Sequence, residues 1–220
     1  IRKVWGRDAA VLAPPVAVDR FRWDQPRDDV YLCLCRLVPY KRVDLVVEAF
    51  NRLALPLLVV GEGPERSRLE QMAGPTVTIL GRQSQQQVEQ LLARCRAYVY
   101  AGLEDFGIAP VEAMASGAPV IGLGRGGLLD TVRCAASGMA DATGVLFPDQ
   151  TVDSLTEAVR WFERRQLWQV LDAAVLRQWA ERFRPEAFAQ RFDAILQRAW
   201  TTHQQRCLHA ASDPVGMRKL

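Results

Sequence analysis

Short apolar runs alternate with longer stretches of helical periodicity over the first two thirds of the chain. The runs are continuous in hydrophobicity, which is typical of strands buried on both faces of a parallel sheet. Six strands are predicted, at residues 30–35, 57–60, 77–80, 98–101, 120–122 and 145–147. Crossover helices are predicted between them, at residues 42–53, 65–72, 85–93, 107–116 and 128–134. This order predicts an α/β domain with a doubly wound, Rossmann-like parallel sheet.

The pattern becomes purely helical after Pro148. Further helices are predicted at residues 152–163, 168–183 and 185–200. The last residues, 201–220, have weak periodicity and are predicted to be loosely held. We therefore divide the chain into an incoming linker segment at 1–21, an α/β domain at 22–182, and a C-terminal helix with a loose tail at 183–220.

The composition of the 220 residues fits a folded domain that binds a compact, modestly polar ligand. Hydrophobic residues make up 49% and charged residues 24%, which excludes a disordered chain. The net charge of +3 is small and scattered, so no nucleic-acid partner is expected. No run of about 18 apolar residues is present, so no transmembrane helix is predicted.

The five cysteines show no metal-ligand spacing and no CxxC pair. Cys33 and Cys35 share one face of a predicted strand, about 7 Å apart at the usual strand rise, which suits core packing better than a disulfide. Reduced thiols and a cytoplasmic location are therefore expected.

Polar residues follow the predicted strands at the points where the strands end. Arg36 and Lys41 follow the first strand, and Gly61 and Gly63 follow the second. Glu104 follows the fourth strand. Ligands of open α/β sheets bind beyond the carboxyl ends of the strands, so these residues are expected to meet at one edge. There the two cations would offset the charge of a phosphate group.

The residues after the fourth strand lead into a helix whose N-terminus faces that edge. The free amides of Gly107 and Ile108, with the helix dipole, favour a phosphate group there. Glu112 lies about 6 Å further along the axis, at 1.5 Å per residue, which is the reach from a diphosphate to a ribose. Glu104 is placed to hold hydroxyl groups of a sugar. Asp105 is expected to cap the helix.

Together these residues resemble the donor-binding domain of the glycosyltransferases of group 1, or family 4, which have the GT-B fold of two facing Rossmann-like domains. The resemblance covers residues from about 11 to about 198. Its strongest element is the E-x7-E motif from Glu104 to Glu112. The R-x4-K spacing of Arg36 and Lys41, the GEGP turn that begins at Gly61, and the glycine pair at 126–127 also match.

The resemblance implies a retaining transferase of which this chain is the C-terminal, donor-binding half. Arg36 and Lys41 then stabilise the departing diphosphate, Glu104 contacts the donor sugar, and Glu112 binds the ribose. The donor is a nucleotide sugar, and neither a metal ion nor another cofactor is required. The N-terminal acceptor domain is expected to be absent, and the chain alone is expected to be inactive.

Several alternatives stay open at this point. The context of PYKR and EDFGIAPVE resembles the mannosyltransferases and favours GDP-mannose, with a UDP-sugar such as UDP-glucose as the alternative donor. The loops at 61–64 and at Gly81 and Arg82 are expected to select the base. An isolated, non-catalytic nucleotide-binding module and a sugar-nucleotide epimerase are the alternatives from other classes. A nicotinamide dehydrogenase is excluded because the first turn lacks the G-x-G-x-x-G pattern.

The last predicted helix carries an apolar stripe of Phe188, Phe192, Ile195 and Ala199. In the family this helix crosses back to the other domain. In this chain the stripe is therefore expected to be exposed and to favour self-association. Peripheral contact of the full-length protein with the inner face of a membrane is a further expectation.

Overall fold

The computed structural model describes residues 2–138 and 140–212, and it confirms the doubly wound α/β fold. All strands are parallel and form one sheet in the order β3-β2-β1-β4-β5-β6. The strands are β1 (Tyr31–Leu34), β2 (Leu57–Val60), β3 (Val77–Gly81), β4 (Tyr98–Tyr100), β5 (Val120–Leu123) and β6 (Gly144–Phe147). The switch point of this sheet lies between β1 and β4, where the chain changes direction across the sheet.

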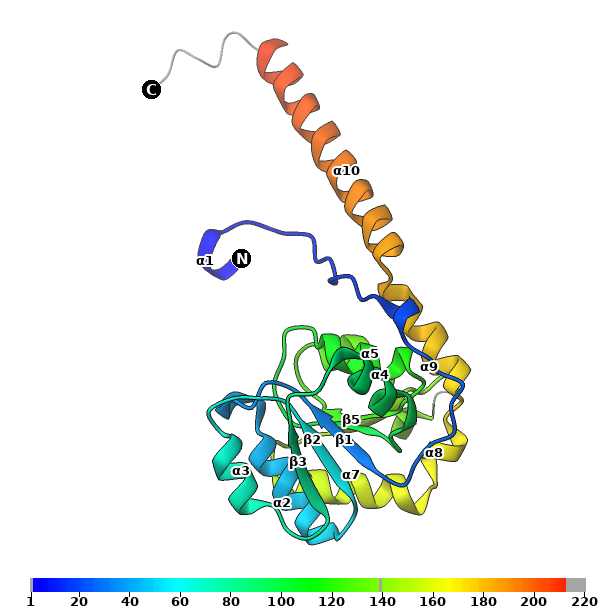
Figure 1. Cartoon of the computed structure of the whole chain (residues 1–220). Coiled ribbons are helices and arrows are strands. Elements are labelled where there is room, and N and C mark those ends of the chain that lie inside the picture. Colours follow the sequence, from blue (N-terminus) through cyan, green and yellow to red (C-terminus); the bar gives the residue numbers. More distant parts are fainter. Residues whose placement is uncertain (1, 139, 213–220) are drawn as a thin grey trace.

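Helices cover both faces of the sheet (Figure 1). One face carries α2 (Val43–Leu53), α3 (Arg66–Met72), α7 (Val152–Arg164) and α8 (Leu167–Val170). The other face carries α4 (Gln85–Arg94), α5 (Ile108–Ala115), α6 (Leu128–Thr131) and α9 (Ala173–Ala180). Shorter elements are α1 (Arg2–Trp5) and the 3-10 turns η1 (Val18–Arg20), η2 (Pro39–Lys41), η3 (Ala135–Ser137) and η4 (Glu181–Phe183).

Successive residues of a strand point into two different cores. In β1, Tyr31 and Cys33 belong to the core beneath α2 and α7, whereas Leu32 belongs to the core beneath α4 and α5. Each of the three is at most 1% exposed. Because both faces are covered, both sets of positions must be apolar, and this is why continuous apolar runs predicted the strands.

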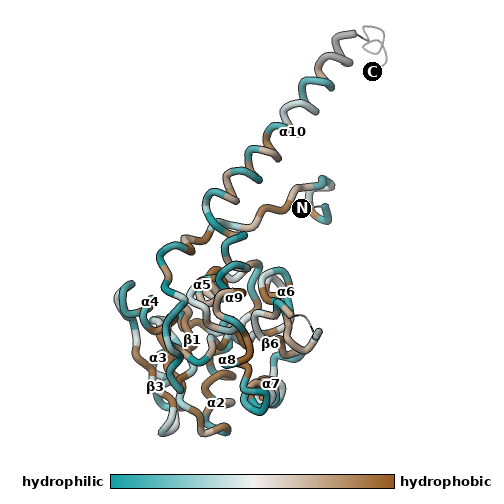
Figure 2. Tube along the Cα trace, turned by 90° about the vertical axis from the view of Figure 1, so that its right-hand side faces the viewer, coloured by the Kyte–Doolittle hydropathy of each residue, from teal (hydrophilic) through white to brown (hydrophobic). Residues whose placement is uncertain are grey.

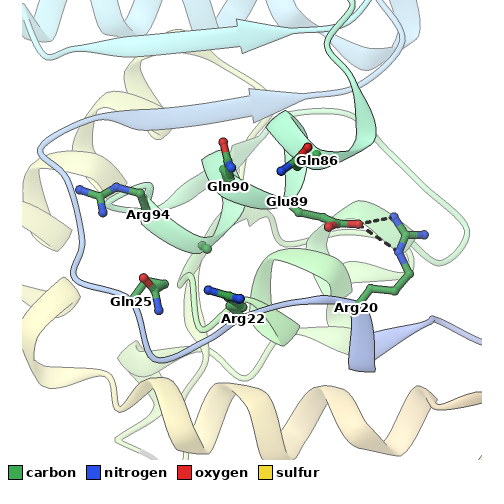
Figure 3. A pocket seen from close by; sticks show the side chains of 8 residues that line it. Arg20, Arg22, Gln25, Gln86, Glu89, Gln90 and Arg94 are labelled. Carbon is green, nitrogen blue, oxygen red and sulfur yellow. Dashed lines mark hydrogen bonds and ion pairs between the residues drawn. The ribbon is translucent and has the colours of Figure 1, made fainter.

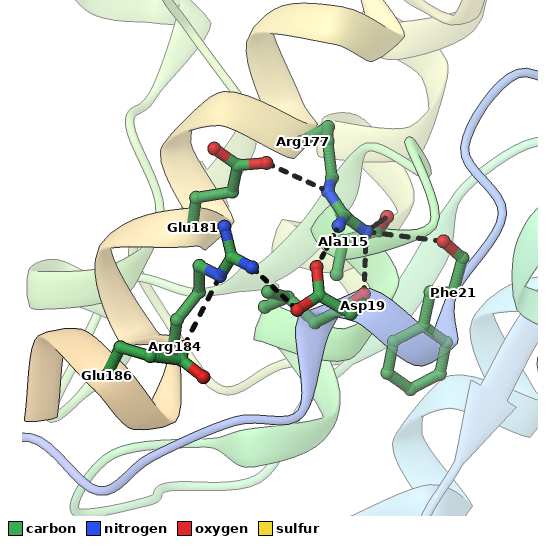
Figure 4. Close-up of polar contacts among 8 residues, drawn as sticks. Asp19, Phe21, Ala115, Arg177, Glu181, Arg184 and Glu186 are labelled. Atoms are coloured by element: carbon green, nitrogen blue, oxygen red, sulfur yellow. Dashed lines mark hydrogen bonds and ion pairs between the residues drawn. The ribbon is translucent and has the colours of Figure 1, made fainter.

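Charged side chains bind the end of the incoming segment (residues 1–21) to α9 and to the residue after η4 (Figure 4). The guanidinium group of Arg177 on α9 donates to the carbonyl of Val18 at 2.6 Å and to that of Ala115, the last residue of α5, at 3.4 Å. It also pairs with Asp19 at 2.9 Å, and Arg184 pairs with the same carboxylate at 2.7 Å. The end of the incoming segment is thereby held against the C-terminus of α5.

The long helix α10 (Pro185–Ser212) extends away from the sheet (Figure 1), and hydrophobic and hydrophilic residues alternate along it (Figure 2). Phe192 is 48%, Leu196 55% and Trp200 60% exposed. Residues 201–212, which the sequence predicted as part of a loose tail, continue this helix, and 213–220 lie outside the described residues. No helix of the described ranges is long and apolar enough to cross a membrane.

Two predicted helices end earlier than expected. The helix predicted to reach residue 134 ends at Thr131, because Cys134 forms a parallel bridge with Gly144 beside the sheet. The helix predicted at 168–183 is divided, because Asp172 has an extended backbone and its carboxylate accepts from the amide of Ala174 at 2.8 Å. This carboxylate caps the new helix, α9.

Candidate functional site

A cavity of about 440 Å³ lies at the carboxyl ends of β1 and β4, at the switch point of the sheet. The loop after β1 forms one wall, and the loop from β4 into α5 forms the other. Its lining consists of Pro14, Leu34, Cys35, Arg36, Tyr40, Lys41, Tyr98, Tyr100, Glu104, Asp105, Phe106, Gly107, Ile108, Ala109 and Pro110. Five predicted site residues are thus brought together here, as the positions of the strand ends required.

A larger hollow of about 550 Å³ lies between the segment 20–25 and α4 (Figure 3). Its arginines are largely engaged, because Arg20 pairs with Glu89 at 2.9 Å and Arg94 pairs with Asp28 at 2.6 Å. None of its lining residues belongs to the predicted site. We therefore take the cavity at the switch point as the candidate site.

Lys41 and Glu104 form an ion pair across this cavity. Their side chains are 14% and 24% exposed, so the pair is largely shielded from solvent. Aromatic rings surround the cation: Nζ of Lys41 lies 4.9 Å from the ring centroid of Tyr40 and 5.6 Å from that of Tyr100. The site therefore holds its lysine against a carboxylate in a largely shielded position.

Arg36 presents a second positive charge at the cavity. The residue is exposed, and no carboxylate among the described residues pairs with it. An unpaired guanidinium group offers two donors in a planar fork, which suits two phosphate oxygens at once.

A glycine pair holds the loop that carries Glu104. The amide of Gly127 donates to the carbonyl of Glu104 at 2.7 Å. A Cβ atom on Gly127 would lie 2.5 Å from the carbonyl oxygen of Asp105 and 2.5 Å from the amide nitrogen of Phe106, and one on Gly126 would overlap the Glu104 carbonyl. The glycines matched in the sequence therefore act through close backbone packing beneath this loop.

The N-terminus of α5 opens into the cavity. Gly107 is its N-cap residue, with φ +88°, and no side chain caps the helix. The prediction that Asp105 caps it is therefore wrong, because the N-cap residue lies two positions after Asp105. Neither Gly107 nor Ile108 donates its amide to an acceptor among the described residues. Free amides and the positive end of the helix dipole make this point suitable for a phosphate group.

Glu112 lies beyond the lining of the cavity, on the side of α5 that faces Arg20 and Glu89. Burial raises the pKa of its carboxyl group above the ordinary value, the charge of Arg20 opposes this shift, and that of Glu89 adds to it. No described residue is hydrogen-bonded to this carboxylate. It is a partly buried acceptor without a partner one turn from the helix N-terminus.

Gly61, Gly63 and Arg82 do not reach the cavity. A Cβ atom on Gly61 would overlap the carbonyl of Cys35, and one on Gly63 would lie 2.9 Å from the amide nitrogen of Leu37. The two glycines therefore support the loop that carries Arg36. Arg82 donates its amide to Glu62 at 3.0 Å and is exposed.

The sequence did not predict Tyr100 or Cys35 as site residues, and both line the cavity. Tyr100 ends β4, and its hydroxyl group donates to Glu104. Cys35 follows β1, and contact with the Cys33 thiol, with the charge of Lys41, lowers the pKa of Cys35 although burial opposes the shift. Both residues lie at the ends of the two switch-point strands, and this position in the sequence could have predicted them as site residues. No metal-binding group of three or more His, Cys, Asp or Glu occurs in the described ranges.

Solved structures show the class of domain that this fold defines. The sucrose-phosphate synthase of Thermosynechococcus elongatus matches with a TM-score of 0.72 and 22% identity over 91% of this chain and 56% of that one. HepE of Anabaena, in complex with UDP and glucose, matches with a TM-score of 0.66 and 21% identity over 78% of this chain and 49% of that one. The fold is that of a GT-B glycosyltransferase domain.

The sequence comparisons identify the family. The profile of the glycosyl transferases group 1 matches residues 18–182, and the chain belongs to this family. A GDP-mannose-dependent alpha-mannosyltransferase of Mycobacterium tuberculosis (strain CDC 1551 / Oshkosh) is 32% identical over 149 residues, which are 66% of this chain and 38% of that protein. An N-acetyl-alpha-D-glucosaminyl L-malate synthase of Bacillus anthracis is 30% identical over 70% of this chain and 42% of that protein. The chain thus spans less than half the length of these relatives.

Proposed function

We propose that this chain binds the nucleotide-sugar donor of a retaining hexosyltransferase. The observation that carries the proposal is the cavity in which the free amides of Gly107 and Ile108 meet the cations of Arg36 and Lys41. These groups suit a diphosphate, and Glu104 beside them suits the hydroxyl groups of a sugar.

The chemistry follows from where charge develops during transfer. When the bond between the anomeric carbon and the diphosphate oxygen breaks, its electron pair leaves with the diphosphate. Arg36, Lys41 and the α5 amides stabilise that growing negative charge, and losing one such contact costs about 2.7–4 kcal/mol of barrier. The acceptor oxygen forms the new bond, and its proton passes to the departing phosphate group. Two cations and a helix N-terminus supply this stabilisation without a metal ion.

Glu112 is proposed to bind the ribose. It lies on α5 four residues after Ile108, and its partly buried carboxylate has no hydrogen-bond partner in the described part of the chain. Two vicinal hydroxyl groups would satisfy it. Gly61 and Gly63 support the loop of Arg36 in this account, and Arg82 at the end of β3 remains a candidate contact for the base.

GDP-mannose is the favoured donor. The relative from Mycobacterium tuberculosis and a relative from Mycolicibacterium smegmatis, 30% identical over 190 residues, are both named as GDP-mannose-dependent mannosyltransferases. HepE of Anabaena forms a complex with UDP and glucose, so a UDP-sugar is the alternative donor. Binding without catalysis by the chain alone is a second candidate function, which the open cavity and the partial span of the relatives favour.

Calorimetric titration with GDP, UDP, GDP-mannose and UDP-glucose, with and without magnesium, tests the proposal. We expect saturable binding of one nucleotide and its sugar, independent of magnesium and weakened at least tenfold by Arg36→Ala. The exposed pair of Arg125 with Asp149, which lies outside the cavity, offers Arg125→Ala as the matched arginine control. Equal weakening by both substitutions would contradict the proposal.

The exposed apolar face of α10 supports the further proposal that the chain self-associates through this helix.

A further inference from the structure

Tyr100 reaches from the end of β4 to the carboxylate of Glu104. Its hydroxyl group donates to Oε1 of Glu104. The ring stacks on that of Tyr98, with centroids 6.4 Å apart and planes 17° apart, and the Tyr98 hydroxyl donates to the carbonyl of Leu34 at 2.8 Å. Gly102 leaves room for the Tyr100 hydroxyl, because a Cβ atom there would overlap it. The phenol is therefore held in one position with the carboxylate as its acceptor.

Lys41 contacts the same carboxylate oxygen. Its Nζ atom pairs with Oε1 of Glu104 and lies above the Tyr100 ring. No described residue donates to Oε2 of this carboxylate. Glu104 is thus fixed through one oxygen, and the other oxygen is left as an acceptor beside the cavity.

We propose that Tyr100 is a positioning residue, which holds the Glu104 carboxylate in place for the donor sugar when Lys41 moves to the diphosphate. The inference rests on the proposed function. Once an anion draws Lys41 away, Tyr100 is the remaining protein partner of Oε1. Oε2 is then presented to a sugar hydroxyl with its direction already fixed, which lowers the entropic cost of that contact.

The state of the phenol suits this role. Burial raises the pKa of Tyr100 above its ordinary value, and the nearby thiols of Cys35 and Cys33 act in the same direction. The group therefore stays protonated at neutral pH and remains a donor. A hydrogen bond to an ionised acceptor is about twice as strong as one between neutral groups.

The test compares the affinity for the nucleotide sugar with the affinity for the nucleoside diphosphate. The dissociation constants of GDP and GDP-mannose, and of UDP and UDP-glucose, are measured by calorimetry for the 220-residue chain and for Tyr100→Phe. The matched control is Tyr31→Phe, which removes another tyrosine hydroxyl that donates to a glutamate, Glu163, at the opposite end of the sheet. Both variants are also made in a Glu104→Ala background, which removes the acceptor of the Tyr100 hydroxyl group, and thermal unfolding shows that each is folded.

We expect Tyr100→Phe to weaken the nucleotide sugar about tenfold more than the nucleoside diphosphate. Tyr31→Phe leaves the ratio of the two affinities unchanged. In the Glu104→Ala background the extra loss for the sugar disappears, because Tyr100 acts through that side chain. An equal loss for both ligands, no loss, or a loss that persists in Glu104→Ala overturns the inference while the proposed function stands. Wild-type chain that binds none of the four ligands overturns the proposed function and the inference with it.

Discussion

Gly127→Ala perturbs the site from below without touching a charged group. The new Cβ atom would lie 2.5 Å from the carbonyl oxygen of Asp105 and 2.5 Å from the amide nitrogen of Phe106. Carbon requires roughly 3.5 Å from its neighbours, so the loop must move by about 1 Å. Both obstacles are backbone atoms, so no side chain can relieve the contact by rotating. The displaced loop carries Glu104 and leads into the N-terminus of α5.

A shift of this size lengthens hydrogen bonds to a bound diphosphate beyond their useful range. Losing one bond to a charged group costs about 1.5–3 kcal/mol, so nucleotide affinity is expected to fall at least about tenfold. Overpacking is expected to lower the free energy of unfolding by about 1–3 kcal/mol. Calorimetry and urea denaturation measure the two effects, and Gly124→Ala is the control, because its Cβ atom would meet no atom closer than 3.4 Å. Unchanged affinity in Gly127→Ala would refute the argument that this glycine positions the loop.

Arg177→Ala is expected to lower the free energy of unfolding in urea by about 2–3 kcal/mol, because it releases the carbonyls that its guanidinium group holds; a change no larger than that of the exposed Arg125→Ala would contradict this. Glu112→Gln is expected to stabilise the ligand-free chain from about pH 4 upward and to weaken nucleotide binding. The raised pKa of Glu112 makes the folded state bind more protons than the unfolded state, so wild-type stability falls as pH rises through that range; a pH–stability curve that Glu112→Gln leaves unchanged would refute the assignment. Bound nucleotide is expected to slow alkylation of Cys35 by iodoacetamide, followed by mass spectrometry, and to leave the exposed Cys207 unaffected; equal rates with and without nucleotide would contradict the location of the site.

The strands were predictable because a sheet covered on both faces requires uninterrupted apolar residues. The helix boundaries were less so. Asp172 interrupts a segment of good helical periodicity by capping a new helix, and Cys134 leaves a predicted helix to pair with Gly144. Both choices depend on neighbours that lie far away in the sequence. Residues 201–212 are helical without a strong apolar period. They extend the preceding turns of α10, and their residue types tolerate the helical conformation.

The sequence predicted which residues line the cavity correctly at the ends of the switch-point strands, and less well after the neighbouring strand. Arg36, Lys41 and Glu104 meet because parallel strands end at one edge. Gly61 and Gly63 follow β2, which is one strand removed from the switch point, and they pack against the loop of Arg36 instead of lining the cavity. Their spacing matches the family motif equally well whether they touch a ligand or a neighbouring loop, so the pattern alone does not distinguish the two roles.

A crystal structure of the chain with GDP-mannose tests whether the cavity at the switch point is the donor site. We expect the diphosphate at the amides of Gly107 and Ile108, with Lys41 turned from Glu104 toward a phosphate oxygen and the ribose hydroxyls on Glu112. A nucleotide bound in the hollow between the segment 20–25 and α4, with the Lys41–Glu104 pair intact, would contradict it.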